Sequence, residues 1–99
     1  MSTAVFHDEG RRLRALACRD GVTVAFGPHA EREMRKDRLT RVDVLSILRR
    51  CSVIGCELHL LEWRWTASGR TCDGELVEIV CVIEEEKIRI DVVTVWKKK

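Results

Sequence analysis

Apolar residues repeat with two different periods along this 99-residue chain. Up to about residue 50 they recur every three or four positions, which is typical of helices that bury one face. From residue 52 onward they alternate with polar residues or form short unbroken runs, which is typical of strands. We therefore expect helices in the first half of the chain and a sheet in the second half.

The first helix is expected over residues 3–19, and a short strand follows it. Asp20-Gly21 would end this helix, because glycine accepts the left-handed conformation that is common just after a helix. Residues 22–26 are a run of β-forming residues, so they are predicted to form a strand.

Two further helices are predicted before the sheet. Pro28 suits the first position of a helix, where its missing N–H costs nothing, and this helix is expected to end near Arg38. Thr40 can cap the next helix by exchanging hydrogen bonds with Asp43. That third helix is expected to end near Arg50, where arginine favours the negative end of the helix dipole.

The second half of the chain predicts an antiparallel meander. Asp73-Gly74 is a strong hairpin signal, and Gly55 marks a bulge or a turn. In the longest alternating run, Trp63 and Trp65 share the apolar face and are expected in the core. The expected strands cover residues 52–57, 58–68, 76–83 and 88–96.

This order of elements predicts one α+β domain over residues 1–99. Helices that precede such a meander are expected to segregate onto one side of it. The predicted architecture is therefore a set of N-terminal helices packed on one face of a three- or four-stranded antiparallel sheet.

Composition agrees with a globular protein. Apolar residues make up 45% and charged residues 34%, and no apolar run approaches the roughly 18 residues that cross a membrane. Because no signal segment opens the chain, we expect a cytoplasmic protein without membrane contact. The first fifty residues hold eleven Lys and Arg against seven Asp and Glu. That excess favours contact with phosphate, although ordinary solvated helix faces give the same count.

The chain has five cysteines but no Cys-x-x-Cys pair. They are Cys18, Cys51, Cys56, Cys72 and Cys81. Structural zinc sites usually show paired ligands at short spacing, so we expect no metal and no cofactor. The thiols are expected to be reduced and buried, where they act as small apolar side chains.

The candidate chemistry is RNA cleavage without a metal. The chain has no Gly-rich phosphate loop, no Gly-x-Ser-x-Gly elbow and no His-Glu-x-x-His helix. Cleavage through the RNA 2′-hydroxyl needs a base, an acid and a cation for the crowded phosphate. His29 could transfer protons, because histidine titrates near neutral pH and a helix start binds anions. Arg32, one turn on, and Arg64, on the polar side of its strand, are candidate phosphate ligands.

Further residues are candidates for contacting nucleic acid outside this catalytic set. They are Arg35, Arg38, Arg70 and Trp96, of which the tryptophan could stack on a base. Structural interpretations compete with these roles. His29 could cap its helix or bond to Glu33, and Arg64 could pair with Glu62 or Glu78 across strands.

Several short segments, in this order and spacing, carry a resemblance to a known family. They are residues 28–34 (PHAEREM), 39–44 (LTRVDV), 63–65 (WRW), 69–70 (GR), 73–74 (DG) and 92–96 (VVTVW). Over about residues 22–96 the chain resembles an uncharacterised family of small toxin-like bacterial and phage proteins. That family is similar to BrnT-type toxins of the RelE-like ribonuclease group. The resemblance implies a compact α+β fold, mRNA cleavage without a metal, and an antitoxin partner.

The chain departs from the family pattern at two basic positions. The family has arginine four and eight residues after the histidine, where this chain has Glu33 and Asp37. Either Arg32 and Arg38 take over, or the cleavage site is lost, because carboxylates repel phosphate. The leading hypothesis is a toxin-type endoribonuclease that acts on RNA. The alternative is a non-catalytic phage or mobile-element module that grips a protein partner, and a homodimer through the N-terminal helix is left open.

Overall fold

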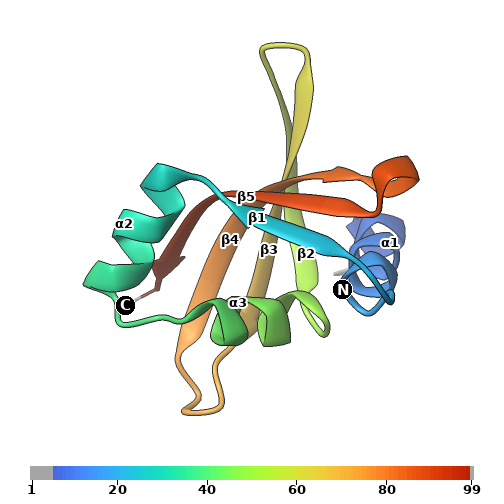
Figure 1. Ribbon diagram of the computed structural model, residues 1–99. Coiled ribbons are helices and arrows are strands. Elements are labelled where there is room, and N and C mark those ends of the chain that lie inside the picture. Colours follow the sequence, from blue (N-terminus) through green and yellow to red (C-terminus); the bar gives the residue numbers. More distant parts are fainter. Residues whose placement is uncertain (1–5, 99) are drawn as a thin grey trace.

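The computed structural model describes residues 6–98 and combines helices with one five-stranded sheet (Figure 1). The helices are α1 (His7–Ala17), α2 (Pro28–Lys36) and α3 (Arg41–Leu48), with a short 3-10 turn, η2 (Glu85–Lys87). The strands are β1 (Thr23–Phe26), β2 (Ser52–His59), β3 (Glu62–Arg70), β4 (Leu76–Glu84) and β5 (Arg89–Lys97). No helix within residues 6–98 is long and apolar enough to cross a membrane.

The sheet is mixed, with the strand order β1-β5-β4-β3-β2. The four strands β5, β4, β3 and β2 are antiparallel, whereas β1 lies parallel to β5, with Ala25 beside Asp91. The α+β class and the antiparallel meander are confirmed, but the sheet is larger than expected, because β1 joins it as a fifth strand parallel to β5. Local sequence identifies a strand at β1, but its partner lies more than sixty residues further on, and no local pattern encodes that pairing.

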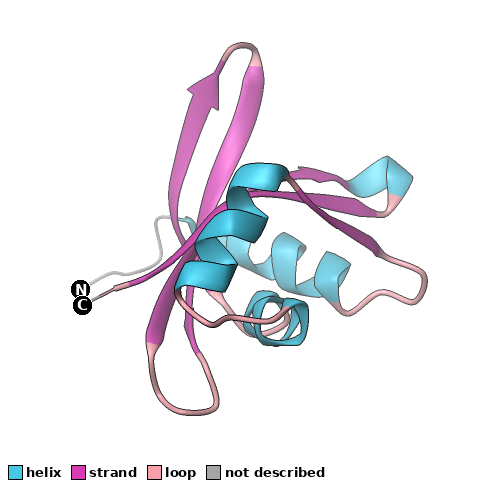
Figure 2. Ribbon diagram, turned by 60° about the vertical axis from the view of Figure 1, so that its left-hand side comes forward, coloured by secondary structure: helices cyan, strands magenta, loops and turns pink. Residues whose placement is uncertain are grey.

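The core lies between the sheet and the helices α1 and α3. Side chains alternate along the three central strands, and one set is fully or nearly fully buried. These buried strand residues are Trp65, Ala67, Val77, Ile79, Cys81, Ile90, Val92 and Val95. From α1 and α3, Leu13, Val44, Ile47 and Leu48 join the same cluster. Figure 2 shows these two helices on one side of the strands.

Helix α2 packs beside the second half of β5. Strand β1 pairs only with the first half of β5, and the chain then turns into α2 at Gly27, whose N–H donates to Val92 O at 3.1 Å. At the other end of the helix, the Lys97 N–H donates to Asp37 Oδ2 at 3.0 Å. Asp37 therefore anchors the end of β5 to α2, so this carboxylate has a structural use.

Most local signals for the helices are confirmed. Thr40 and Asp43 form the expected capping box, with Asp43 N–H donating to Thr40 Oγ1 at 3.1 Å and Thr40 N–H donating to Asp43 Oδ2 at 2.8 Å. Helix α2 begins with Pro28 at its first position, as predicted. The described part of α1 begins at His7 and ends at Ala17, and the predicted start at residue 3 lies outside the described residues.

Helix α2 ends in a Schellman motif centred on Arg38. The Leu39 N–H donates to Met34 O at 2.8 Å, and the Arg38 N–H donates to Arg35 O at 3.2 Å. Arg38 itself has a φ of +57°, in the left-handed region that favours glycine. The backbone of Arg38 is therefore strained. Its side chain forms no hydrogen bond within residues 6–98 that would offset this strain.

Replacing Arg38 by glycine is expected to raise the free energy of unfolding by about 1 kcal/mol, because glycine has no Cβ to clash in this conformation. Urea denaturation followed by circular dichroism measures the change. As a matched control, glycine at Arg32, in the middle of α2, should lower the free energy of unfolding by about 1 kcal/mol. A loss of stability with glycine at position 38 would contradict the assignment of the motif.

The β2–β3 hairpin extends beyond the rest of the sheet. Its turn is Leu60-Leu61, with φ values of +50° and +68°, so the expected single strand over residues 58–68 is wrong. Pairing of β3 with β4 begins only at Trp65, opposite Cys81. Residues 57–64 therefore form a two-stranded ribbon, which we call the arm, and it projects from the sheet in Figure 1.

The arm separates the two tryptophans that the alternating pattern grouped together. Trp65 lies under the helices and is only 6% exposed, as predicted for a core residue. Trp63 is 56% exposed, so its assignment to the core is wrong. Both side chains point to the same side of β3, but the helix layer does not extend far enough to cover Trp63. The other turn predictions are confirmed, with Gly74 at φ +85° and a bulge between Val53 and Gly55.

Candidate functional site

The sheet has a second side that faces away from α1 and α3. Along the central strands, the residues that alternate with the buried set are all partly exposed. They are Arg64, Thr66, Ser68, Glu78, Val80, Val82, Asp91, Thr94 and Trp96. We call this surface the open face. It combines a cation, hydroxyl groups and an indole on a rigid support, which are the groups that proteins use to hold single-stranded nucleic acid.

Arg64 is the unpaired cation of the open face. Its Nε atom is shielded from solvent and has no hydrogen-bond partner in the part of the chain that the structure describes. Glu57 is its cross-strand neighbour on β2, yet no ion pair joins the two within the described residues. The expected pairing of Arg64 with Glu62 or Glu78 is absent among residues 6–98 as well. A shielded guanidinium donor without an acceptor is costly, and the charge of this guanidinium is not balanced by an ion pair within residues 6–98.

Three carboxylates on this side of the sheet, Glu78, Glu84 and Asp91, are engaged with other cations, whereas Glu57, the cross-strand neighbour of Arg64, forms no ion pair within residues 6–98. These ion pairs are Glu78 with Lys98 at 3.5 Å, Glu84 with Lys87 at 3.2 Å, and Asp91 with Arg89 at 2.8 Å. The hydrogen bond from Arg89 to Asp91 raises the pKa of the arginine. Because these carboxylates are locally neutralised, they repel an approaching phosphate less than their number suggests.

Trp96 lies on the open face near the end of β5, opposite Glu78 of β4. It is partly exposed, so one part of its ring contacts the sheet and the remainder is accessible. Arg64 and Trp96 therefore share one side of the sheet, with β4 between their strands. The structure brings these two predicted residues onto one surface.

His29 is exposed on a flank of α2. On the opposite flank, Glu31 forms an ion pair with Arg41 of α3, on the core side of the sheet. Successive residues of a helix are rotated by 100° about its axis, so His29 and Glu33 lie on the other flank of α2 from Glu31. That flank turns toward the open face. Glu33 pairs with Lys36 at 3.7 Å, and no hydrogen bond joins it to His29 within the described residues.

The predicted catalytic set does not converge on one point. Two strand spacings separate Arg64 on β3 from β5, about 10 Å, and a packed helix adds roughly 8–10 Å more to reach α2. Arg64 and His29 are therefore placed to contact different parts of a bound nucleic-acid strand. Arg32 is exposed and points further around α2, two residue steps from the buried Ala30.

The other residues predicted to contact nucleic acid lie outside the centre of the open face or form hydrogen bonds with the backbone. Arg35 is exposed on α2, and Arg38 ends that helix. The Arg70 Nη1 donates to Gly74 O at 2.8 Å, which fastens the β3–β4 turn. The Arg70 carbonyl oxygen in turn accepts from Arg50 Nη2 at 2.7 Å. Arg70 is therefore engaged in the turn, whereas Arg64 is not engaged at all among the described residues.

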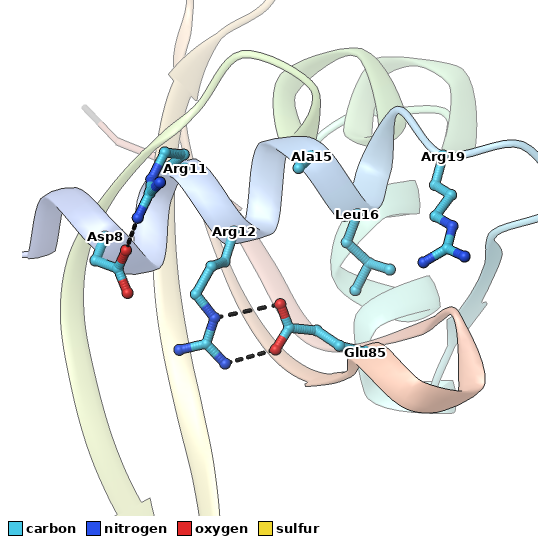
Figure 3. Close-up of a pocket in the computed structure, with 7 residues that line it drawn as sticks. All are labelled: Asp8, Arg11, Arg12, Ala15, Leu16, Arg19 and Glu85. Carbon is cyan, nitrogen blue, oxygen red and sulfur yellow. Dashed lines mark hydrogen bonds and ion pairs between the residues drawn. The ribbon is translucent and has the colours of Figure 1, made fainter.

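A hollow between α1 and η2 is closed by an ion pair that the sequence did not predict (Figure 3). Arg12 donates two hydrogen bonds to Glu85, Nε to Oε2 at 3.2 Å and Nη2 to Oε1 at 2.5 Å. These bonds lower the pKa of Glu85 and raise that of Arg12. The Arg12 guanidinium also lies 5.3 Å from the centre of the Trp65 ring. The pair is separated by 73 positions along the chain, so no sequence motif could have identified it.

The cysteines divide into two groups. Cys51 and Cys81 are buried as expected, and burial raises their pKa values to about 11 and about 12. Cys18 and Cys72 are exposed, so the expectation of burial is wrong for them, and Cys56 is intermediate. No group of three or more His, Cys, Asp or Glu side chains within residues 6–98 is arranged to hold a metal ion.

Comparison with known proteins identifies a family but no closer relative. Residues 26–97 match the model of a family described as a domain of unknown function, DUF4258. This match runs from Phe26, the last residue of β1, to the end of β5, and it includes His29, Arg64 and Trp96. No curated protein and no solved structure matches the chain.

Proposed function

The chain belongs to the DUF4258 family, and on that premise we propose that it is a toxin-like domain that binds RNA across the open face of its sheet. The observation that carries the proposal is Arg64, whose guanidinium forms no hydrogen bond or ion pair within residues 6–98, while Glu78, Glu84 and Asp91 are paired with other cations. A fixed, unpaired guanidinium on an exposed sheet is suited to a phosphate. The resemblance of residues 28–34 and 39–44 to toxin-like proteins supplies the choice of RNA.

In this proposal the open face holds the strand with two kinds of contact. Arg64 binds a backbone phosphate, and the hydroxyl groups of Thr66 and Ser68 lie on the same strand within its reach. Trp96 stacks on a base, a contact that tolerates any sequence because every base has a π-face. The proposed binding is therefore strongly salt-dependent and weakly sequence-specific.

Cleavage is assigned to His29, at a phosphate other than the one that Arg64 holds. His29 occupies the first turn of α2, where free backbone N–H groups favour an anion. As general base, His29 would take the proton of the RNA 2′-hydroxyl while the 2′-oxygen attacks the adjacent phosphorus. The P–O5′ bond then breaks, leaving a cyclic phosphate, and the protonated imidazole returns the proton to the departing 5′-oxygen. Arg32 lies on the next turn of the same helix. Glu33 and Asp37 replace the family arginines. Glu33 pairs with Lys36, and Asp37 anchors the end of β5. In this proposal, His29 and Arg32 are therefore the two side chains that act on the scissile phosphate.

Induced expression in bacteria, with growth and mRNA integrity followed over time, tests this assignment. The unchanged protein is expected to arrest growth and deplete mRNA. His29→Ala should abolish both effects while leaving RNA binding by the purified protein intact, and Arg64→Ala should reduce all three. Arg19→Ala, an exposed arginine on the helix side, is the matched control and should behave like the unchanged protein. Normal growth and intact mRNA, together with no RNA binding in vitro, would contradict the proposal.

The arm favours a second candidate function, a non-catalytic module that engages a protein. Leu60 and Leu61 at its tip are 86% and 96% exposed, which is far more apolar exposure than a solvated turn requires. In this alternative, replacing Leu61 by serine would abolish the biological effect of the protein, and Arg64→Ala would not. The two candidates are thus separated by which surface, the arm or the open face, is sensitive to substitution.

A further inference from the structure

The arm is amphipathic, and its apolar side has no cover within the described chain. Leu58 pairs with Trp63 across the ribbon and points to the helix side of the sheet, whereas Glu57 pairs with Arg64 and points to the open face. Leu58 and Trp63 are both 56% exposed. A two-stranded ribbon is at best marginally stable in water, so a surface of this kind is expected to be covered by another molecule.

Within residues 6–98, no strand pairs with the outer edge of β2 along the arm. β2 is the last strand of the sheet, so one row of its N–H and C=O groups faces away from β3. Proteins protect such edges with proline, lysine, bulges or short strands. The only bulge of β2 lies between Val53 and Gly55, next to α1, and the arm half carries neither proline nor lysine. The arm edge is therefore open to addition of another strand.

We propose that a second copy of this chain binds here, pairing β2 with β2 antiparallel about a two-fold axis at Leu58. A two-fold axis perpendicular to the sheet keeps the helices of both copies on the same side of the joined sheet. Each β2 residue must then lie opposite a residue of the partner subunit whose side chain points to the same side of the sheet. The axis must therefore pass midway between one residue of β2 and the same residue of the partner subunit. Only a few residues of β2 lie within the arm.

The charges and side chains of β2 select the position of the axis. With the axis at Leu58, two leucines meet at the centre, and Glu57 lies opposite His59 of the partner subunit on both sides. With the axis at Glu57, two carboxylates would face each other, which is unfavourable. With the axis at Cys56, His59 of the partner subunit would lie opposite Val53, a buried residue beside the bulge and α1.

This arrangement has a consequence for the open face. The two sheets join edge to edge through their arms, and the open faces of both copies lie on the same side. Both Arg64 side chains then line one continuous surface that spans the axis. The dimer does not depend on RNA binding, because Leu58 and the strand edge belong to the arm and not to the open face.

Analytical ultracentrifugation of the full chain without RNA tests the dimer, and a charge swap tests its register. The unchanged protein is expected to dimerise. Glu57→Arg and His59→Glu, introduced singly, should each weaken the dimer roughly five- to thirty-fold, because each change acts twice at a symmetric interface. Combining both substitutions restores a favourable pair and should restore the affinity. Val42→Glu on α3, at a side chain that is 76% exposed, is the control and should have no effect.

Disulfide trapping provides an independent measurement. Residues opposite each other on antiparallel strands have Cα atoms about 4.5–5.5 Å apart, within the range that a disulfide spans. Leu58→Cys in a Cys18→Ser, Cys56→Ser, Cys72→Ser background, which removes the other accessible thiols, should therefore form a covalent dimer when copper phenanthroline oxidises the two thiols. Val42→Cys in the same background should not. A monomeric unchanged protein would overturn the proposal, and so would a double charge variant that stays as weak as the single ones.

Discussion

Replacing Trp65 by alanine is expected to lower the free energy of unfolding by about 3–5 kcal/mol, while the same change at Trp63 alters it by less than about 1 kcal/mol. The two residues have the same chemistry and lie two positions apart on one side of β3. Trp65 is enclosed by the helix layer and covered by Arg12, so its removal leaves a cavity. Trp63 stands on the arm, where solvent already reaches it.

Urea denaturation followed by circular dichroism measures both changes. A small domain is stable by only about 5–15 kcal/mol, so alanine at position 65 leaves little margin. Trp65→Phe, which keeps most of the apolar volume, remains measurable if the alanine protein does not fold. It should lose less than the alanine variant and more than Trp63→Phe. Equal losses at positions 63 and 65 would show that the helix layer covers the arm.

Replacing Gly69 by alanine is expected to lower the free energy of unfolding by about 2 kcal/mol, because α3 leaves no room for a Cβ at this position of β3. A Cβ on Gly69 would lie 2.7 Å from Cγ2 of Ile47, well inside van der Waals contact. Ile47 is fully buried and its branched side chain cannot rotate away without disturbing the core. For a domain of this size, the melting temperature should fall by roughly 8–16 °C.

Two further variants isolate this contact. At Gly55, a Cβ would lie 3.5 Å from the nearest atoms of Thr66, so alanine there should be nearly neutral. In the double variant with Ile47→Leu, the Cγ2 methyl that causes the clash is absent, and part of the loss at Gly69 should be recovered. If Gly69→Ala melts at the same temperature as the unchanged protein, α3 does not sit this close to β3.

Features with a local cause could be predicted from the sequence. The capping box of Thr40 and Asp43, the start of α2 at Pro28 and the turn at Asp73-Gly74 each depend on residues that are neighbours in the chain. The confirmed bulge at Gly55 belongs to the same class. Such signals identify where elements begin and end, and here they were sufficient for the α+β class.

Features that depend on distant contacts could not be predicted. The parallel pairing of β1 with β5 is one, and it changes the sheet from antiparallel to mixed. The turn at Leu60-Leu61 is another, because leucine has no preference for the positive φ values found there. Alternation continues through this turn, so it concealed both the hairpin and the exposure of Trp63.

The candidate site was predicted only in part. Alternation correctly assigned Arg64 to the side of β3 opposite Trp65, since that follows from strand geometry. The absence of a partner for Arg64 within residues 6–98 depends on side-chain positions in the folded sheet, where Glu78, Glu84 and Asp91 pair with other cations. The separation of His29 from Arg64 likewise depends on α2 packing beside β5, which no motif encodes.

The central claim, that the open face holds RNA through Arg64, is tested most directly by the affinity of the purified chain for single-stranded RNA at several salt concentrations. Fluorescence anisotropy with a labelled oligonucleotide gives both the affinity and its salt dependence. Arg64→Ala is expected to weaken binding about tenfold or more and to reduce the slope of log K against log salt by about 0.7, the value for one phosphate contact. Arg19→Ala should change neither quantity. Equal affinities and slopes for the unchanged protein and Arg64→Ala would contradict the claim.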